Sequence, residues 1–83
     1  MKSTEIAALY GSVLGAADVA EDDDFFEIGG SSFSALTLIA QLNTAAGSVV
    51  LRMRDVIRAR TPRALAYIME TRLEGAEPSG GPR

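Results

Sequence analysis

The residues of this chain best suited to chemistry are two adjacent serines that follow a pair of glycines. The run Asp24-Phe25-Phe26-Glu27-Ile28-Gly29-Gly30-Ser31-Ser32-Phe33 leads from acidic and aromatic residues into what we expect to be a helix. The first backbone N–H groups of a helix have no partner within it, and the helix dipole makes that end positive. A serine hydroxyl there is well placed to carry a phosphate group, and Ser32 is our candidate.

The two glycines suit the same chemistry. An enzyme that brings a serine oxygen onto a phosphate needs little bulk beside the hydroxyl, and Gly29 and Gly30 allow that approach. A simpler interpretation stays open at this point, in which Ser31 or Ser32 only caps the helix and the glycines only form a turn.

Composition argues against catalysis by the chain itself. It has 83 residues, enough for one small domain, and no cysteine or histidine. These absences remove the usual nucleophile–base pairs, disulfides and the commonest metal ligands. We therefore expect no catalytic residue and no metal site. Residues 1–46, with one lysine and seven acids, have a net charge of −6, whereas residues 47–83, with seven arginines and four acids, have +3.

The charged clusters have ordinary explanations. The acidic run Glu21–Asp24 fits a calcium loop poorly, because Phe26 falls where an oxygen ligand is required. We expect this run to be solvated, with Asp24 orienting the loop. The arginines lack interleaved aromatic residues, which argues against nucleic acid, so we expect Arg54 and Arg58 to pair with loop acids or to meet a partner enzyme.

Apolar spacing and helix-end signals predict an all-α fold, a small bundle of three main helices and one short one in residues 1–73. The expected helices run from Ser3 or Thr4 to Leu14 before Gly15, from Phe33 to Ala46 before Gly47, around Met53–Ala59, and from Thr61-Pro62 to Leu73. Residues 16–31 form a long loop, and residues 74–83 are expected to be a disordered tail.

The inward-facing residues follow from the same spacing. They are Ile6, Leu9, Tyr10, Val13 and Leu14, then Ala35, Leu38, Ile39 and Leu42, then Val56 and Ile57, and finally Leu65, Ile68 and Met69. In an extended loop Phe26 and Ile28 point to one side, opposite Phe25 and Glu27, so we predict Phe26 and Ile28 as core anchors. We interpret Val49-Val50-Leu51 as a buried connector.

The helical stripe near the N-terminus and the lack of a long apolar stretch argue against a leader or a membrane span, so we expect a cytoplasmic protein.

Motif and spacing together resemble the carrier-protein family, specifically the peptidyl carriers, or thiolation domains, of nonribosomal peptide assembly. The resemblance covers about residues 4–73. The matching residues are Asp24, Phe25, Phe26, Ile28, Gly29, Gly30 and Ser32, followed by Leu38, Leu42, Gly47, the Arg54-Asp55-Val56 step and Thr61.

This resemblance implies that a phosphopantetheinyl transferase attaches 4′-phosphopantetheine from coenzyme A to Ser32, with Gly29, Gly30 and Ser31 completing the site. The arm's thiol would hold an aminoacyl or peptidyl group as a thioester for an adenylation enzyme and for condensation or tailoring enzymes of natural-product (antibiotic) biosynthesis. We expect a monomeric, free-standing carrier that is not itself an enzyme. An excised domain of a larger synthetase is the rival interpretation.

Three positions depart from the family pattern. Ser31 stands where His, Asp or Asn is usual, Phe33 where Leu or Ile is usual, and Arg60 where proline is common. The second helix of this chain carries no charged residue. Fatty-acyl carriers, by contrast, resemble a group whose second helix has an acidic stripe that meets basic partners. We therefore expect apolar docking, and the predicted partner-binding residues are Phe33, Leu36, Ala40, Met53 and Arg54. Phe33 and Leu36 could equally be half-buried core residues.

Two other functions remain as alternatives: an acyl carrier for polyketide or fatty-acid enzymes, and a helical interaction module in which Ser32 only caps a helix.

Overall fold

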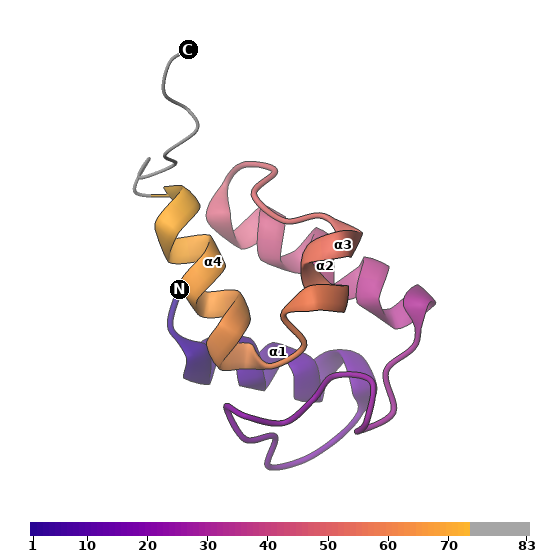
Figure 1. The fold of residues 1–83 in the computed structure, drawn as a ribbon. Coiled ribbons are helices and arrows are strands. Elements are labelled where there is room, and N and C mark those ends of the chain that lie inside the picture. The colour runs from indigo at the N-terminus through magenta and orange to yellow at the C-terminus, as the bar shows by residue number, and fades with distance from the viewer. Residues whose placement is uncertain (74–83) are drawn as a thin grey trace.

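The structure, a computed structural model, describes residues 1–73, which form four helices and no strand. The helices are α1 (Ser3–Leu14), α2 (Ser32–Ala46), α3 (Met53–Arg58) and α4 (Pro62–Leu73). Helix α1 packs against α4 and α2, α3 packs on α2, and the long loop between α1 and α2 runs along the outside of α1 (Figure 1). The predicted all-α bundle is confirmed. The predicted tail, residues 74–83, lies outside the described residues.

The helix ends follow the local signals in the sequence. Gly15 and Gly47 adopt left-handed backbone angles, with φ of 67° and 80°, and end α1 and α2 as predicted. The Thr61 hydroxyl accepts a hydrogen bond from the Ala64 N–H at 3.1 Å, so the predicted cap of α4 is also confirmed.

The start of α1 differs from the prediction. Lys2, not Ser3 or Thr4, is the residue that precedes the first helical turn, and its backbone N–H donates to the Glu5 carboxylate at 2.9 Å. The Ser3 hydroxyl instead donates to the carboxylate of Glu21 in the loop. Ser3 is thus used to hold the loop and not to cap the helix.

The core draws on all four helices and the loop. Its buried members are Ile6, Tyr10, Phe25, Ala35, Leu38, Ile39, Leu42, Leu51, Val56, Ala59, Leu65 and Met69. The predicted inner stripes of α1 and α2 are confirmed, with Leu9, Val13 and Leu14 partly buried against the core. In α4, Leu65 and Met69 are buried and Ile68 is partly buried.

Two predicted core positions are wrong. Ile57 is 49% exposed while Val56 is fully buried. In α3 the buried neighbours are Asp55 and Val56, and the next residue, about 100° further round the helix, faces solvent. Val49 is 72% exposed, whereas Leu51 is buried and Val50 is partly buried against the core, so the connector is anchored at its C-terminal end.

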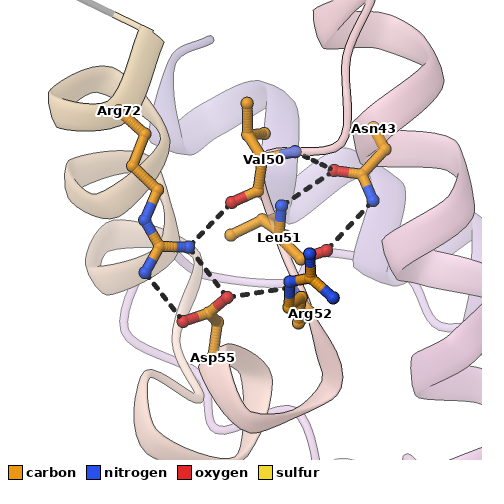
Figure 2. A network of polar contacts seen from close by, with 6 residues as sticks. All are labelled: Asn43, Val50, Leu51, Arg52, Asp55 and Arg72. Carbon is orange, nitrogen blue, oxygen red and sulfur yellow. Dashed lines mark hydrogen bonds and ion pairs between the residues drawn. The ribbon is translucent and has the colours of Figure 1, made fainter. Parts of the chain in front are cut away.

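The side chain of Asn43 on α2 holds this connector in place of a strand partner (Figure 2). Its Oδ1 accepts the N–H groups of Val50 and Leu51 at 3.0 and 2.9 Å, and its Nδ2 donates to the Leu51 carbonyl at 3.1 Å. The amide therefore satisfies three backbone groups next to the buried Leu51 side chain.

Asp55 is the one charged residue in the described part of the chain that is buried, and it joins α3 to α4. Arg72 donates to its two carboxylate oxygens at 2.8 and 3.1 Å and to the Val50 carbonyl at 2.7 Å (Figure 2). The Arg52 N–H donates to the same carboxylate at 2.8 Å. Burial raises the pKa of Asp55, but the hydrogen bonds from Arg72 and Arg52 and the charges of Arg72 and Arg54 outweigh it and lower the pKa overall.

The fold should therefore lose stability in acid through Asp55. Because the pKa is lowered in the folded state, this contribution is present above the unfolded pKa of about 3.9 and is lost as pH falls through the folded value. We expect Asp55→Asn to lower the free energy of unfolding at pH 7 by roughly 2–3 kcal/mol, measured by urea titration. The same variant should lose less further stability than wild type when the pH is taken below 4.

Asp22→Asn is the matched control, because Asp22 also has a lowered pKa, caused mainly by its hydrogen bond from Arg63, but its side chain is 72% exposed. It should change stability little. A loss in Asp22→Asn as large as that in Asp55→Asn would contradict the role given to burial.

Candidate functional site

Ser32 is the first residue of α2 and is exposed at the end of the long loop. Its hydroxyl makes no hydrogen bond with any part of the chain that the structure describes, and neither do the backbone N–H groups of Ser32 and Phe33. Helix α2 thus presents a projecting hydroxyl beside two unused donors at its positive end. Phosphate oxygens bind such donors.

Ser31 is the N-cap of α2, so the capping role falls on Ser31 and not on Ser32. The Ser31 hydroxyl accepts the Ser34 N–H at 3.2 Å, and the Ser34 hydroxyl accepts the Ser31 N–H at 2.8 Å. The Ser34 hydroxyl also donates to the Ser31 carbonyl at 3.1 Å. This reciprocal pair occupies both hydroxyls that flank Ser32 and leaves the Ser32 hydroxyl free.

The two glycines fill different structural roles. Gly29 has φ of 112°, which residues with a side chain rarely adopt. Gly30 lies so close to Phe25 that a Cβ there would be 2.3 Å from the ring and 2.6 Å from the carbonyl oxygen. Gly29 therefore permits the turn, and Gly30 permits the close packing of the turn on Phe25.

The core anchor of the loop is Phe25, and the prediction that Phe26 and Ile28 fill this role is wrong. Phe25 is fully buried, whereas Phe26 and Ile28 are partly buried at the edge of the core. The reason is that the segment is a series of turns and not extended. The Asp24 carboxylate accepts the N–H groups of Phe26 and Glu27 at 2.9 and 3.2 Å, which bends the chain there.

Asp24 orients the loop, as predicted, but the arginines that meet the loop acids are not the predicted ones. Arg60 lies 3.6 Å from the Asp24 carboxylate, and Arg63 donates to Asp22 at 2.8 Å. Both arginines lie near the start of α4, which the loop crosses. Arg54 and Arg58 project from α3 instead and are exposed.

Sequence reasoning placed Tyr10 in the core but missed its polar contact. The Tyr10 hydroxyl donates to the Arg60 carbonyl at 2.7 Å, and its ring meets the Phe25 ring edge-on with centroids 5.0 Å apart. Burial, with a smaller effect from Asp24, raises the pKa of Tyr10, so the hydroxyl stays protonated as a donor. Fifty positions separate the partners, and no local pattern indicates such a contact.

The predicted partner-binding residues lie on two neighbouring helices. Phe33 and Leu36 are 80% and 56% exposed, and Ala40 continues the same face of α2. Phe33 and Leu36 are therefore surface residues and not half-buried core. On α3, Arg54 is exposed and Met53 is partly buried against the core.

None of the helices in residues 1–73 is both long and apolar enough to cross a membrane.

Comparison with known proteins agrees with this geometry. Residues 4–67 match the family described as "Phosphopantetheine attachment site", whose members carry covalent 4′-phosphopantetheine, so the predicted cofactor is confirmed at the level of the family. The isonitrile lipopeptide synthase of Mycobacterium tuberculosis is 35% identical over 78 residues, which are 94% of this chain and 3% of that protein. The chain thus corresponds to a small part of such a synthase.

Two solved structures are similar to the chain. An archaeal thiolation-reductase di-domain from a non-ribosomal peptide synthetase is 40% identical, with a TM-score of 0.74 over 82% of this chain and 14% of that one. BlmI, a type-II acyl-carrier protein of Streptomyces verticillus, gives a TM-score of 0.80 over 86% of this chain and 84% of its own, at 24% identity, and supports the fold alone. The chain therefore belongs to the phosphopantetheine attachment site family and is a carrier domain of the peptidyl type.

Proposed function

We propose that Ser32 carries the 4′-phosphopantetheine arm and that the arm holds aminoacyl or peptidyl groups as thioesters. One observation carries the assignment of the residue. Of the three serines at the start of α2, Ser31 and Ser34 are hydrogen-bonded to each other, and Ser32 alone has a free, exposed hydroxyl. The site fits the group, because a phosphodiester on Ser32 lies beside the unused N–H groups of the helix end.

The role of the chain in the transfer is to supply the acceptor oxygen. The Ser32 hydroxyl gives its proton to the transferase, and its oxygen bonds to phosphorus in the pyrophosphate of coenzyme A as adenosine 3′,5′-bisphosphate leaves. The positive end of α2 then stabilises the negative charge of the ester by about 0.3–1 kcal/mol. Bound there, the arm supplies the thiol on which cargo is carried.

The chain holds cargo without catalysing its reactions, and its partners are the phosphopantetheinyl transferase, an adenylation enzyme, and condensation or tailoring enzymes. The likeness to a thiolation domain joined to a reductase supports a partner that acts on the thioester. We place the carrier domain in residues 1–73. A cytoplasmic location and a free-standing monomeric state also stay predictions.

The assignment of Ser32 is tested by intact-protein mass after incubation with coenzyme A and a broad-specificity phosphopantetheinyl transferase. Wild type and Ser31→Ala should each gain one phosphopantetheine, and Ser32→Ala should gain none. Ser31→Ala is the matched control, because it removes the adjacent hydroxyl and costs about 1 kcal/mol of helix capping without removing the acceptor. A folded wild type that several transferases leave unmodified would indicate a helical interaction module instead.

The type of cargo is tested by loading the modified protein. Charging of the arm with an amino acid by an adenylating enzyme is the expected result. Charging solely by an acyltransferase from a malonyl donor would support the acyl-carrier alternative and contradict the peptidyl assignment.

The exposed face of α2 should act in partner docking. We expect Leu36→Ala to lower the rate of aminoacyl loading by a cognate adenylation enzyme about fivefold or more, because a central apolar contact is lost. The melting temperature should stay nearly unchanged, since Leu36 is 56% exposed. Leu73→Ala, at a comparably exposed leucine on α4, should affect neither quantity. A large drop in the melting temperature of Leu36→Ala would show that Leu36 supports the core.

A further inference from the structure

The backbone carbonyl of Arg60, between α3 and α4, joins three distant parts of the chain. It accepts the Tyr10 hydroxyl at 2.7 Å, from α1, and the Phe25 N–H at 2.9 Å, from the long loop. Both lone-pair positions of this oxygen are thus occupied. This one atom therefore ties the Phe25 backbone both to α1 and to the segment before α4.

Phe25 in turn holds the position of the turn that precedes Ser32. Its carbonyl accepts the Gly30 N–H at 2.9 Å, and its ring packs against Gly30 with no space for a side chain. One residue, Ser31, separates Gly30 from Ser32, and Ser31 is itself held by its reciprocal bonds with Ser34. Between Phe25 and Gly30, the Ile28 N–H donates to the Asp24 carbonyl at 3.1 Å and the Gly29 N–H to the Phe26 carbonyl at 3.4 Å.

Tyr10 supports this arrangement in two ways. Its fully buried ring meets the Phe25 ring at an interplanar angle of 81°. Its hydroxyl donates to the Arg60 carbonyl, which also accepts the Phe25 N–H. We propose that Tyr10 is a positioning residue for phosphopantetheine transfer, acting through the Arg60 carbonyl and Phe25 on the placement of the Ser32 oxygen. This inference rests on the proposed function of Ser32.

The consequence is kinetic because the transferase must align the Ser32 oxygen with phosphorus. Small misplacements of reacting groups lower rates strongly even when binding is intact. Removal of the Tyr10 hydroxyl should therefore lower kcat, by about threefold to tenfold for one lost hydrogen bond. The KM for coenzyme A should not change, because coenzyme A binds to the transferase.

The experiment compares Tyr10→Phe with wild type in transferase kinetics, at a temperature where circular dichroism shows both to be folded. Tyr67→Phe is the matched control, because it makes the same chemical change at a tyrosine that is 71% exposed on α4. Gly47→Ala is the control for stability. It strains the left-handed cap at the far end of α2, with φ of 80°, and should destabilise the protein without slowing transfer.

Amide hydrogen exchange gives a second readout that does not depend on the transferase. The Gly30 N–H should exchange faster in Tyr10→Phe than in wild type, and at the wild-type rate in Tyr67→Phe. Equal kcat for Tyr10→Phe and wild type, or an equal loss of kcat in Gly47→Ala, would overturn the positioning role of Tyr10. Failure of wild type to be modified would instead contradict the assignment of Ser32 itself, so the two failures are distinguishable.

Discussion

Burial of the Phe25 side chain is the interaction on which the rest of the loop and the site depend. Residues 15–31 connect two helices without regular structure, and such a long connection must be held by its own side chains. Burying a phenylalanine contributes about 1.5–3 kcal/mol, and Phe25 is fully buried against Tyr10. The backbone on either side of it then has a fixed position from which Gly30 and Ser32 follow.

The polar groups that stabilise the fold are different from the polar groups of the proposed attachment site. Two of its polar attachment points, the Arg60 carbonyl and the Asp55 carboxylate, are occupied by partners from other parts of the chain. At the start of α2 the opposite holds, because the Ser32 hydroxyl and two N–H groups have no partner within the described residues. A rigid support beneath an unsatisfied polar end is what a covalent attachment site requires.

Sequence reasoning succeeded where the physical cause is local. Gly15, Gly47 and Thr61 act on the chain within a few residues, so the helix ends could be read directly. The placement of Ser32 at the start of a helix could be read for the same reason, whereas attachment of the arm to Ser32 stays a prediction. Phe25 was misplaced because the alternation rule assumes an extended backbone, whereas the Asp24 side chain bends it. The contact of Tyr10 with Arg60, and that of Asp55 with Arg72, depend on tertiary packing that no spacing rule encodes.

The account depends most on the claim that the fold leaves one of three clustered hydroxyls free. The most direct test is fragmentation of intact, modified wild-type protein in the mass spectrometer, with cleavages between Ser31, Ser32 and Ser34 locating the adduct. The account predicts that all of the phosphopantetheine lies on Ser32. An adduct on Ser31 or Ser34, or a mixture of sites, would contradict it, because those hydroxyls are assigned to holding the helix end.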